Sequence, residues 1–133
     1  MKIDEQQLFE QAKSVLENAY APYSKYQVSA AIVTEDGTIY TGVNIENASY
    51  GLTNCAERTA IFKAVSEGHT SVEAIVIVNG TTEMSKPCGA CRQVMSEFMG
   101  PDSQVFLANV NNDYHEFTFE QILPLAFSDK DMD

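Results

Sequence analysis

The sequence predicts an α/β fold in which helices cover a mixed β-sheet of five strands. Its apolar residues follow the order helix, β-hairpin, helix, strand, helix, strand, strand, helix. Residues 74–78 form a continuous apolar run, which is typical of a strand buried on both faces. A helix and a further strand follow it, and this arrangement implies a parallel pair joined by a right-handed crossover. Helices packed on such a sheet would enclose the core.

The N-terminal part of the chain is expected to form one helix and a β-hairpin. Asp4 and Gln7 can cap the start of the helix, and Pro22 prevents much continuation beyond its end. The apolar stripe of this helix consists of Leu8, Phe9, Ala12, Val15, Leu16 and Ala19. The hairpin strands are expected at residues 28–33 and Ile39–Val43, with the turn at residues 35–38.

Helices and strands alternate through the rest of the sequence. A helix over residues 56–67 should stop at Gly68, and a helix over residues 92–98 should end before Gly100-Pro101. The other expected elements are strands at 74–78 and 105–110, a weakly alternating segment at 115–119 and a short helix at 119–123. No repeat, low-complexity stretch or linker divides the chain, so residues 1–133 are expected to form a single domain with a frayed acidic tail at about 128–133.

The charge of the chain limits its partners. It has 8 Lys and Arg residues against 19 Asp and Glu residues, which gives a formal net charge of −11. Such a field repels DNA and RNA, whose binding depends on neutralising phosphates, so we expect no nucleic-acid partner and a small, unphosphorylated substrate. The first residues lack an apolar signal-peptide core and no later stretch is long enough to span a bilayer, which predicts a cytoplasmic protein with no membrane partner.

Two short motifs carry all three cysteines of the chain. Cys55-Ala56-Glu57 and Pro87-Cys88-Gly89-Ala90-Cys91 each lie where a helix is expected to begin. A helix N-terminus carries partial positive charge and free N–H donors, which favour thiolate over thiol. Two such ends meeting at one point would hold one Zn²⁺ per chain through Cys55, Cys88 and Cys91, with the fourth tetrahedral position left for water.

Glu57 and Arg58 follow the first cysteine and have different expected roles. Glu57 lies two residues after a ligand, so its carboxylate can reach the centre without binding the metal, take a proton from water and return it to a substrate. This placement matches a known deaminase signature, in which a glutamate between zinc ligands is the acid and base. Arg58 could donate a hydrogen bond to a thiolate and offset the charge of a site rich in sulfur.

Two alternatives for the cysteines follow from the residues alone. Cys88 and Cys91 could form a redox-active pair at a helix start, as in thioredoxin-type proteins. A purely structural zinc site would need a fourth ligand, for which His69 and His115 are the only histidines of the chain. The combination of Cys-Ala-Glu with Pro-Cys-x-x-Cys is more specific than either alternative, and it favours a catalytic centre.

At these motifs the sequence resembles the small, homotetrameric, zinc-dependent cytidine deaminases. The resemblance extends from about residue 8 to 128. Its motifs are Ala21-Pro22-Tyr23-Ser24-Lys25-Tyr26, Asn44-Ile45-Glu46-Asn47-Ala48, Cys55-Ala56-Glu57-Arg58-Thr59-Ala60, Pro87-Cys88-Gly89-Ala90-Cys91-Arg92-Gln93 and Leu123-Pro124-Leu125-Ala126-Phe127. It implies a three-layer cytidine-deaminase-like fold around the five-stranded sheet.

The resemblance also implies how a nucleoside binds. Asn44 and Glu46 would hydrogen-bond the ribose hydroxyls, for which both side chains are suited, although an asparagine in a turn and a surface glutamate are the simpler interpretation. Tyr26 would pack near the base, where the family often has Phe. The backbone of Ala56 would read the pyrimidine edge.

A second group of residues is expected to act in a neighbouring subunit. Ala48, Tyr50 and Phe127 would complete that subunit's pocket, with Phe127 stacking on the base. Without the resemblance, Phe127 would more simply be a core anchor for the C-terminal segment.

The activity implied by the resemblance is the hydrolytic deamination of cytidine and 2′-deoxycytidine to uridine and 2′-deoxyuridine with release of ammonia, a reaction of pyrimidine salvage. Deamination of a modified cytosine nucleoside, such as an antibiotic, is an alternative, and the Asn44 and Glu46 pair favours a plain ribose over it. A nucleic-acid-editing deaminase is disfavoured by the acidity of the chain.

Overall fold

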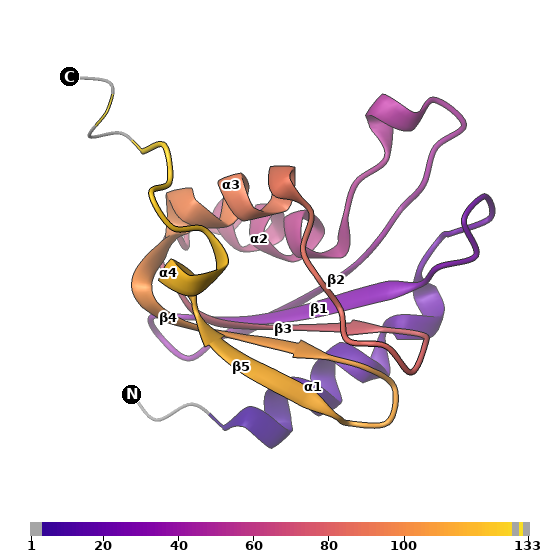
Figure 1. Cartoon of the computed structure of the whole chain (residues 1–133), viewed down its shortest axis with the longest axis horizontal. Helices are drawn as coiled ribbons and strands as arrows, with labels where there is room; N and C mark the ends of the chain where they lie inside the picture. The colour runs from indigo at the N-terminus through magenta and orange to yellow at the C-terminus, as the bar shows by residue number, and fades with distance from the viewer. Residues whose placement is uncertain (1–3, 129–130, 132–133) are drawn as a thin grey trace.

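A mixed five-stranded sheet with the order β2-β1-β3-β4-β5 organises the computed structural model, which describes residues 4–128 and 131 (Figure 1). β3 and β4 are parallel, and the other neighbouring strands are antiparallel. This confirms the predicted sheet and its parallel pair. The strands are β1 (Val28–Thr34), β2 (Ile39–Val43), β3 (Val72–Asn79), β4 (Met99–Ala108) and β5 (Tyr114–Thr118).

The helix α1 (Glu5–Ser14) covers one face of the sheet (Figure 1). Asp4 caps it, since its side chain accepts a hydrogen bond from the backbone N–H of Gln7 at 3.1 Å. A short 3-10 helix, η1 (Leu16–Asn18), follows α1, so the predicted apolar stripe spans two elements. The core on this face consists of Leu8, Phe9, Ala12, Ala31, Val33, Ala74, Val76, Val78, Phe106 and Ala108.

The helices α2 (Ala56–Ser66), α3 (Gly89–Phe98) and α4 (Phe119–Ile122) cover the opposite face, which completes the three predicted layers (Figure 1). Every second side chain of the central strands packs against these helices, because successive side chains of a strand point to opposite faces of the sheet. The core on this face includes Ala30, Ile32, Ala56, Ala60, Ile61, Ala64, Ile75, Ile77, Met95, Val105, Leu107, Phe119 and Ile122.

The starts of α3 and β4 differ most from the prediction. α3 begins at Gly89 rather than at residue 92, because Cys88 acts as its N-cap and accepts from the backbone N–H of Cys91. β4 begins at Met99, well before the apolar run that starts at Val105. Its register against β3 shifts between Val72, which pairs with Met99, and Ala74, which pairs with Gln104, so residues 100–103 form an irregularity in the ladder. Pro101 is tolerated there because proline has no N–H to donate to a neighbouring strand.

Gly42 of β2 lets α2 pack against the sheet at very short range. A Cβ at this position would lie 2.5 Å from the backbone nitrogen of Ala60, 2.7 Å from the carbonyl oxygen of Ala56 and 2.9 Å from Cβ of Thr59. The first turn of α2 therefore rests directly on the backbone of β2, and its position depends on the absence of a side chain there.

Two segments extend beyond the layers. The connection from β2 to α2, with the short helix η2 (Tyr50–Leu52), projects from the body, and the chain after α4 runs outward past α3 (Figure 1). The acidic tail predicted at residues 128–133 lies outside the described residues except for Ser128 and Asp131. In the described part of the chain, no helix has the length and apolarity needed to cross a membrane.

Candidate metal centre and pocket

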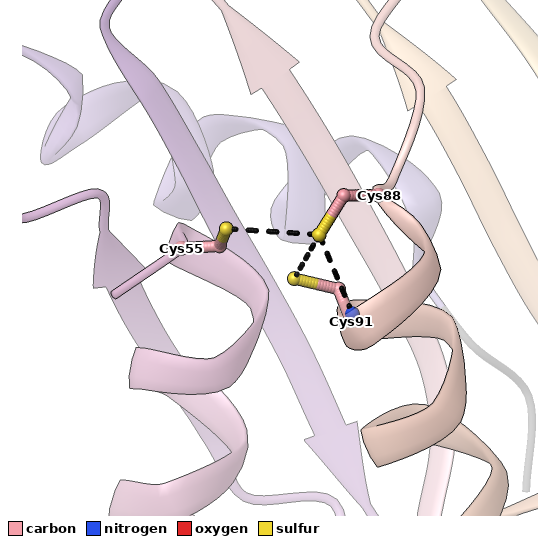
Figure 2. A group of neighbouring side chains, drawn as sticks. All are labelled: Cys55, Cys88 and Cys91. Atoms are coloured by element: carbon pink, nitrogen blue, oxygen red, sulfur yellow. Dashed lines mark hydrogen bonds between the residues drawn. The ribbon is translucent and has the colours of Figure 1, made fainter. Parts of the chain in front are cut away.

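The three cysteines lie together where the starts of α2 and α3 meet (Figure 2). Cys55 is the N-cap of α2, Cys88 is the N-cap of α3, and Cys91 belongs to the first turn of α3. The sulfur atoms of Cys55 and Cys88 are 3.9 Å apart, those of Cys88 and Cys91 are 3.3 Å apart, and all three lie within 4.8 Å of one another. The structure thus confirms that two helix N-termini bring the thiols together.

Neither histidine is placed to close the cluster. His69 contacts the acidic turn after β1, with Nδ1 3.5 Å from Glu35 and Nε2 3.8 Å from Asp36. His115 is exposed on the edge strand β5, where its ring packs against Phe117. Within residues 4–128 and 131, no fourth His, Cys, Asp or Glu joins the three cysteines. The donor set is that of a three-ligand centre, which is typical of catalytic zinc.

The protonation of the thiols depends strongly on their neighbours. Hydrogen bonds from Cys91 and from Arg58 lower the pKa of Cys55 to about 5. The pKa of Cys91 is raised well above its ordinary value, because it donates to Cys55 and is buried. The thiolate of Cys55 therefore forms easily, and its negative charge disfavours the ionisation of Cys91. A divalent cation would offset this repulsion between thiolates. Three clustered sulfur donors suit zinc, whose binding displaces thiol protons.

Arg58 contacts the cluster from its side. Its Nη2 donates to Sγ of Cys55 at 3.4 Å, which is the hydrogen bond to a sulfur ligand expected from the sequence. A guanidinium in this place offsets part of the negative charge that three thiolates would carry.

Glu57 is the second residue of α2 and is buried, with 4% of its surface exposed. Burial raises its pKa, and the neighbouring charge of Cys55 raises it further. A carboxyl group whose pKa lies above the ordinary range exchanges protons more readily near neutral pH, which suits general acid and base chemistry.

A pocket of about 330 Å³ opens beside the cysteines, which is within the range of small-molecule sites. Seven of the residues singled out in the sequence line it: Tyr26, Asn44, Glu46, Cys55, Ala56, Glu57 and Cys88. The lining also includes six residues to which the sequence motifs assign no role, namely Ser24, Val28, Thr53, Ile77, Ser85 and Lys86. Ser85 and Lys86 directly precede Pro87-Cys88, so their position beside that motif was the available signal.

Asn44 and Glu46 reach the pocket from the segment after β2, and both also hold neighbouring backbone. The amide of Asn44 donates to the carbonyl of Tyr26 at 2.8 Å and accepts from the N–H of Val28 at 3.0 Å. Glu46 accepts from the loop before β1, and the hydroxyl of Ser24 is its nearest partner. The hydrogen bond from the Ser24 hydroxyl, followed by those from the backbone N–H groups of Ser24 and Tyr23, lowers the pKa of Glu46 and keeps it ionised.

The residues predicted to serve a neighbouring subunit lie outside this pocket. Tyr50 is 82% exposed, Phe127 is 59% exposed and Ala48 is also exposed. Within the chain Phe127 is therefore no core anchor. Its carbonyl accepts from Nε2 of Gln93 on α3 at 3.0 Å, which ties the C-terminal segment to the helix that carries Cys91.

Known proteins share both the motifs and the fold. The family model for the cytidine and deoxycytidylate deaminase zinc-binding region matches residues 2–108. The chain is 52% identical to a cytidine deaminase of Halalkalibacterium halodurans over 130 residues, which are 98% of each protein. It is 50% identical to a cytidine deaminase of Sporosarcina psychrophila, over 98% of this chain and 96% of that protein.

The fold gives the same result. A crystal structure of cytidine deaminase from Burkholderia pseudomallei superimposes with a TM-score of 0.89 at 47% identity, over 94% of this chain and all of that one (100%). Sequence, sheet order and the three-cysteine centre agree, and the chain belongs to the cytidine and deoxycytidylate deaminase family of zinc-binding enzymes.

Proposed function

We propose that the protein hydrolyses the amino group of cytidine and 2′-deoxycytidine, giving uridine or 2′-deoxyuridine and ammonia, and that it serves pyrimidine salvage. The observation that carries this proposal is the buried carboxyl of Glu57 in the wall of a nucleoside-sized pocket, beside three clustered thiols. Cys55, Cys88 and Cys91 would hold one zinc ion. Zinc with three protein ligands keeps one coordination position open and makes hydroxide available at neutral pH.

Glu57 would carry the protons of the reaction. Its carboxylate accepts a proton from the attacking water and delivers it to N3 of the pyrimidine while the C4–O bond forms. It then takes the remaining hydroxyl proton and transfers it to the amino nitrogen, the C4–N bond breaks, and ammonia leaves. A buried side chain suits this role, because each proton moves within the closed site rather than to bulk water.

The other pocket residues would hold the substrate. Asn44 and Glu46 both line the pocket from the segment after β2 and would bind the ribose hydroxyls, while Tyr26 would pack near the base. The backbone of Ala56, one residue before Glu57, would read the pyrimidine edge. These assignments place the sugar on polar groups and C4 of the base toward the cysteines.

Ala48, Tyr50 and Phe127 would complete the pocket of a neighbouring subunit in a homotetramer. Their exposure supports this, because large apolar side chains in projecting segments are typical of interfaces. Leu125, in the same segment as Phe127, also supports an interface there, because it is a fully exposed apolar side chain. Its φ is 54°, a conformation that bulky residues seldom adopt. The three free cysteines fit a single-domain protein of the reducing cytoplasm.

Glu57→Gln tests the central assignment, because glutamine keeps the shape and removes the acid and base function. We expect zinc content to be retained and kcat for cytidine to fall by about 10²- to 10⁴-fold. Zinc per chain and the loss of cytidine absorbance, with and without chelator, are the measurements. Glu97→Gln on the exposed face of α3 is the matched control. Near wild-type turnover of Glu57→Gln would refute the acid and base role.

A further inference from the structure

The carboxylate of Glu46 is fixed from both sides by the loop that precedes β1. Its Oε1 accepts from the backbone N–H of Tyr23 at 3.0 Å and from that of Ser24 at 3.1 Å. Its Oε2 accepts from the hydroxyl of Ser24. Ser24 thus contacts both oxygens, one through its backbone N–H and one through its hydroxyl, and this pair of contacts sets the plane of the carboxylate.

The hydroxyl of Ser24 is itself oriented by the segment that carries Tyr26. The backbone N–H of Tyr26 donates to Oγ of Ser24 at 3.0 Å. Lys25, between the two, has a φ of 62°, and this left-handed conformation turns the chain so that the contact can form. Ser24, Tyr26 and Glu46 all line the pocket. One hydroxyl therefore receives a hydrogen bond from the segment of Tyr26 and gives one to Glu46.

We propose that Ser24 is a positioning residue whose hydroxyl orients Glu46 toward the sugar of the substrate. The inference rests on the proposed function, in which Glu46 accepts a hydrogen bond from a ribose hydroxyl. The carboxylate has lone pairs beyond those that the loop uses, so it can accept from the sugar while the loop holds it in place. Ser24 acts through Glu46 and leaves Glu57 and the cysteines untouched.

Ser24→Ala should weaken the binding only of nucleosides that carry a 2′- or 3′-hydroxyl. Without the serine hydroxyl, Oε2 of Glu46 loses its partner and the carboxylate can rotate. We expect the inhibition constant of uridine, and KM for cytidine, to rise about tenfold, in line with the loss of a hydrogen bond to a charged group. The inhibition constant of 2′,3′-dideoxyuridine, which has no 2′- or 3′-hydroxyl, should change by less than about twofold. kcat and zinc content should stay as in the wild type.

Two further variants make the test specific. Ser24→Thr keeps the hydroxyl and should restore the affinity for uridine, and in a Glu46→Ala background Ser24→Ala should have no additional effect. Ser14→Ala is the matched control, because Ser14 is an exposed serine whose hydroxyl donates to the carbonyl of Gln11 at the end of α1, away from the pocket lining. Thermal unfolding checks that each variant is folded.

The outcomes separate this inference from the function on which it rests. Equal changes in the inhibition constants of uridine and 2′,3′-dideoxyuridine, or no change in either, would overturn the role of Ser24 alone. A folded, zinc-loaded Ser24→Thr that binds uridine as weakly as Ser24→Ala would overturn it as well. A wild-type protein that does not deaminate cytidine would overturn the proposed function and this inference with it.

Discussion

Arg58 illustrates how one residue beside a metal centre can adjust its charge. Three thiolates around a divalent ion leave a net negative charge, and the guanidinium that contacts Cys55 compensates part of it. After the larger effect of the hydrogen bond from Cys91, the same contact helps to lower the pKa of Cys55. Arg58 therefore favours the deprotonated state that zinc requires.

Arg58→Ala should weaken zinc binding by about 10- to 100-fold, the usual effect of removing a group that bonds a metal ligand. Arg58→Lys should have an intermediate effect, because an ammonium keeps the charge without the planar donor geometry. Competition with a chromophoric chelator measures the affinity, and Lys13→Ala on α1, across the sheet, is the control. Unchanged zinc affinity in Arg58→Ala would show that the contact with Cys55 has no role in metal binding.

At the level of elements, the close contact between α2 and β2 positions both the metal ligand and the proton carrier. Cys55 caps α2 and Glu57 lies in its first turn, so a displacement of this turn moves both relative to Cys88 and Cys91. The side chain of Thr59 adds a second tie, since its hydroxyl lies 3.1 Å from the carbonyl of Val43 and accepts from Asn54 at 2.9 Å.

Gly42→Ala should separate the first turn of α2 from β2, because its Cβ would overlap backbone atoms that cannot move independently. We expect a loss of about 1–3 kcal/mol in the free energy of unfolding, as for overpacked cores, together with lower zinc affinity and lower kcat. Gly100→Ala in β4 is the control, because its new Cβ would lie 4.0 Å from Oγ of Ser103, an ordinary contact distance. If Gly42→Ala and Gly100→Ala unfold at the same temperature with equal zinc content, the close contact does not position the site.

The sequence predicts those features that local signals determine. The start of α2 at Cys55 follows from the loss of strand pattern before its motif, and the run at residues 74–78 predicts β3 because its residues are continuously apolar. The contact of Ser24 with Glu46 joins positions 22 apart in the chain, and the approach of Gly42 to Ala60 depends on packing. Neither has a local pattern, so both become visible only once the elements are placed.

At the level of the whole molecule, exposed apolar side chains are the feature that bears on the proposed assembly. Tyr50 and Phe127 lie in segments that project from the layers of a single chain, and Leu52 beside Tyr50 is 70% exposed (Figure 1). The pocket itself is lined by residues from the loop before β1, the segment after β2 and the starts of α2 and α3. If a neighbour supplies Phe127 to this pocket, each site contains Glu57 from one chain and Phe127 from another.

Mixed oligomers of Glu57→Gln and Phe127→Ala chains should then be more active than either parent. In a symmetric assembly formed at random from equal amounts, about a quarter of the sites would combine an intact Glu57 with an intact neighbouring Phe127. Co-expression with two different tags, purification on both, and a cytidine assay measure the recovery. Glu57→Gln mixed with Cys55→Ser is the control, because both residues line the pocket of the same chain and no site can escape both defects. Activity no higher than the mean of the two parents would show that Phe127 acts within its own chain or has no part in the site.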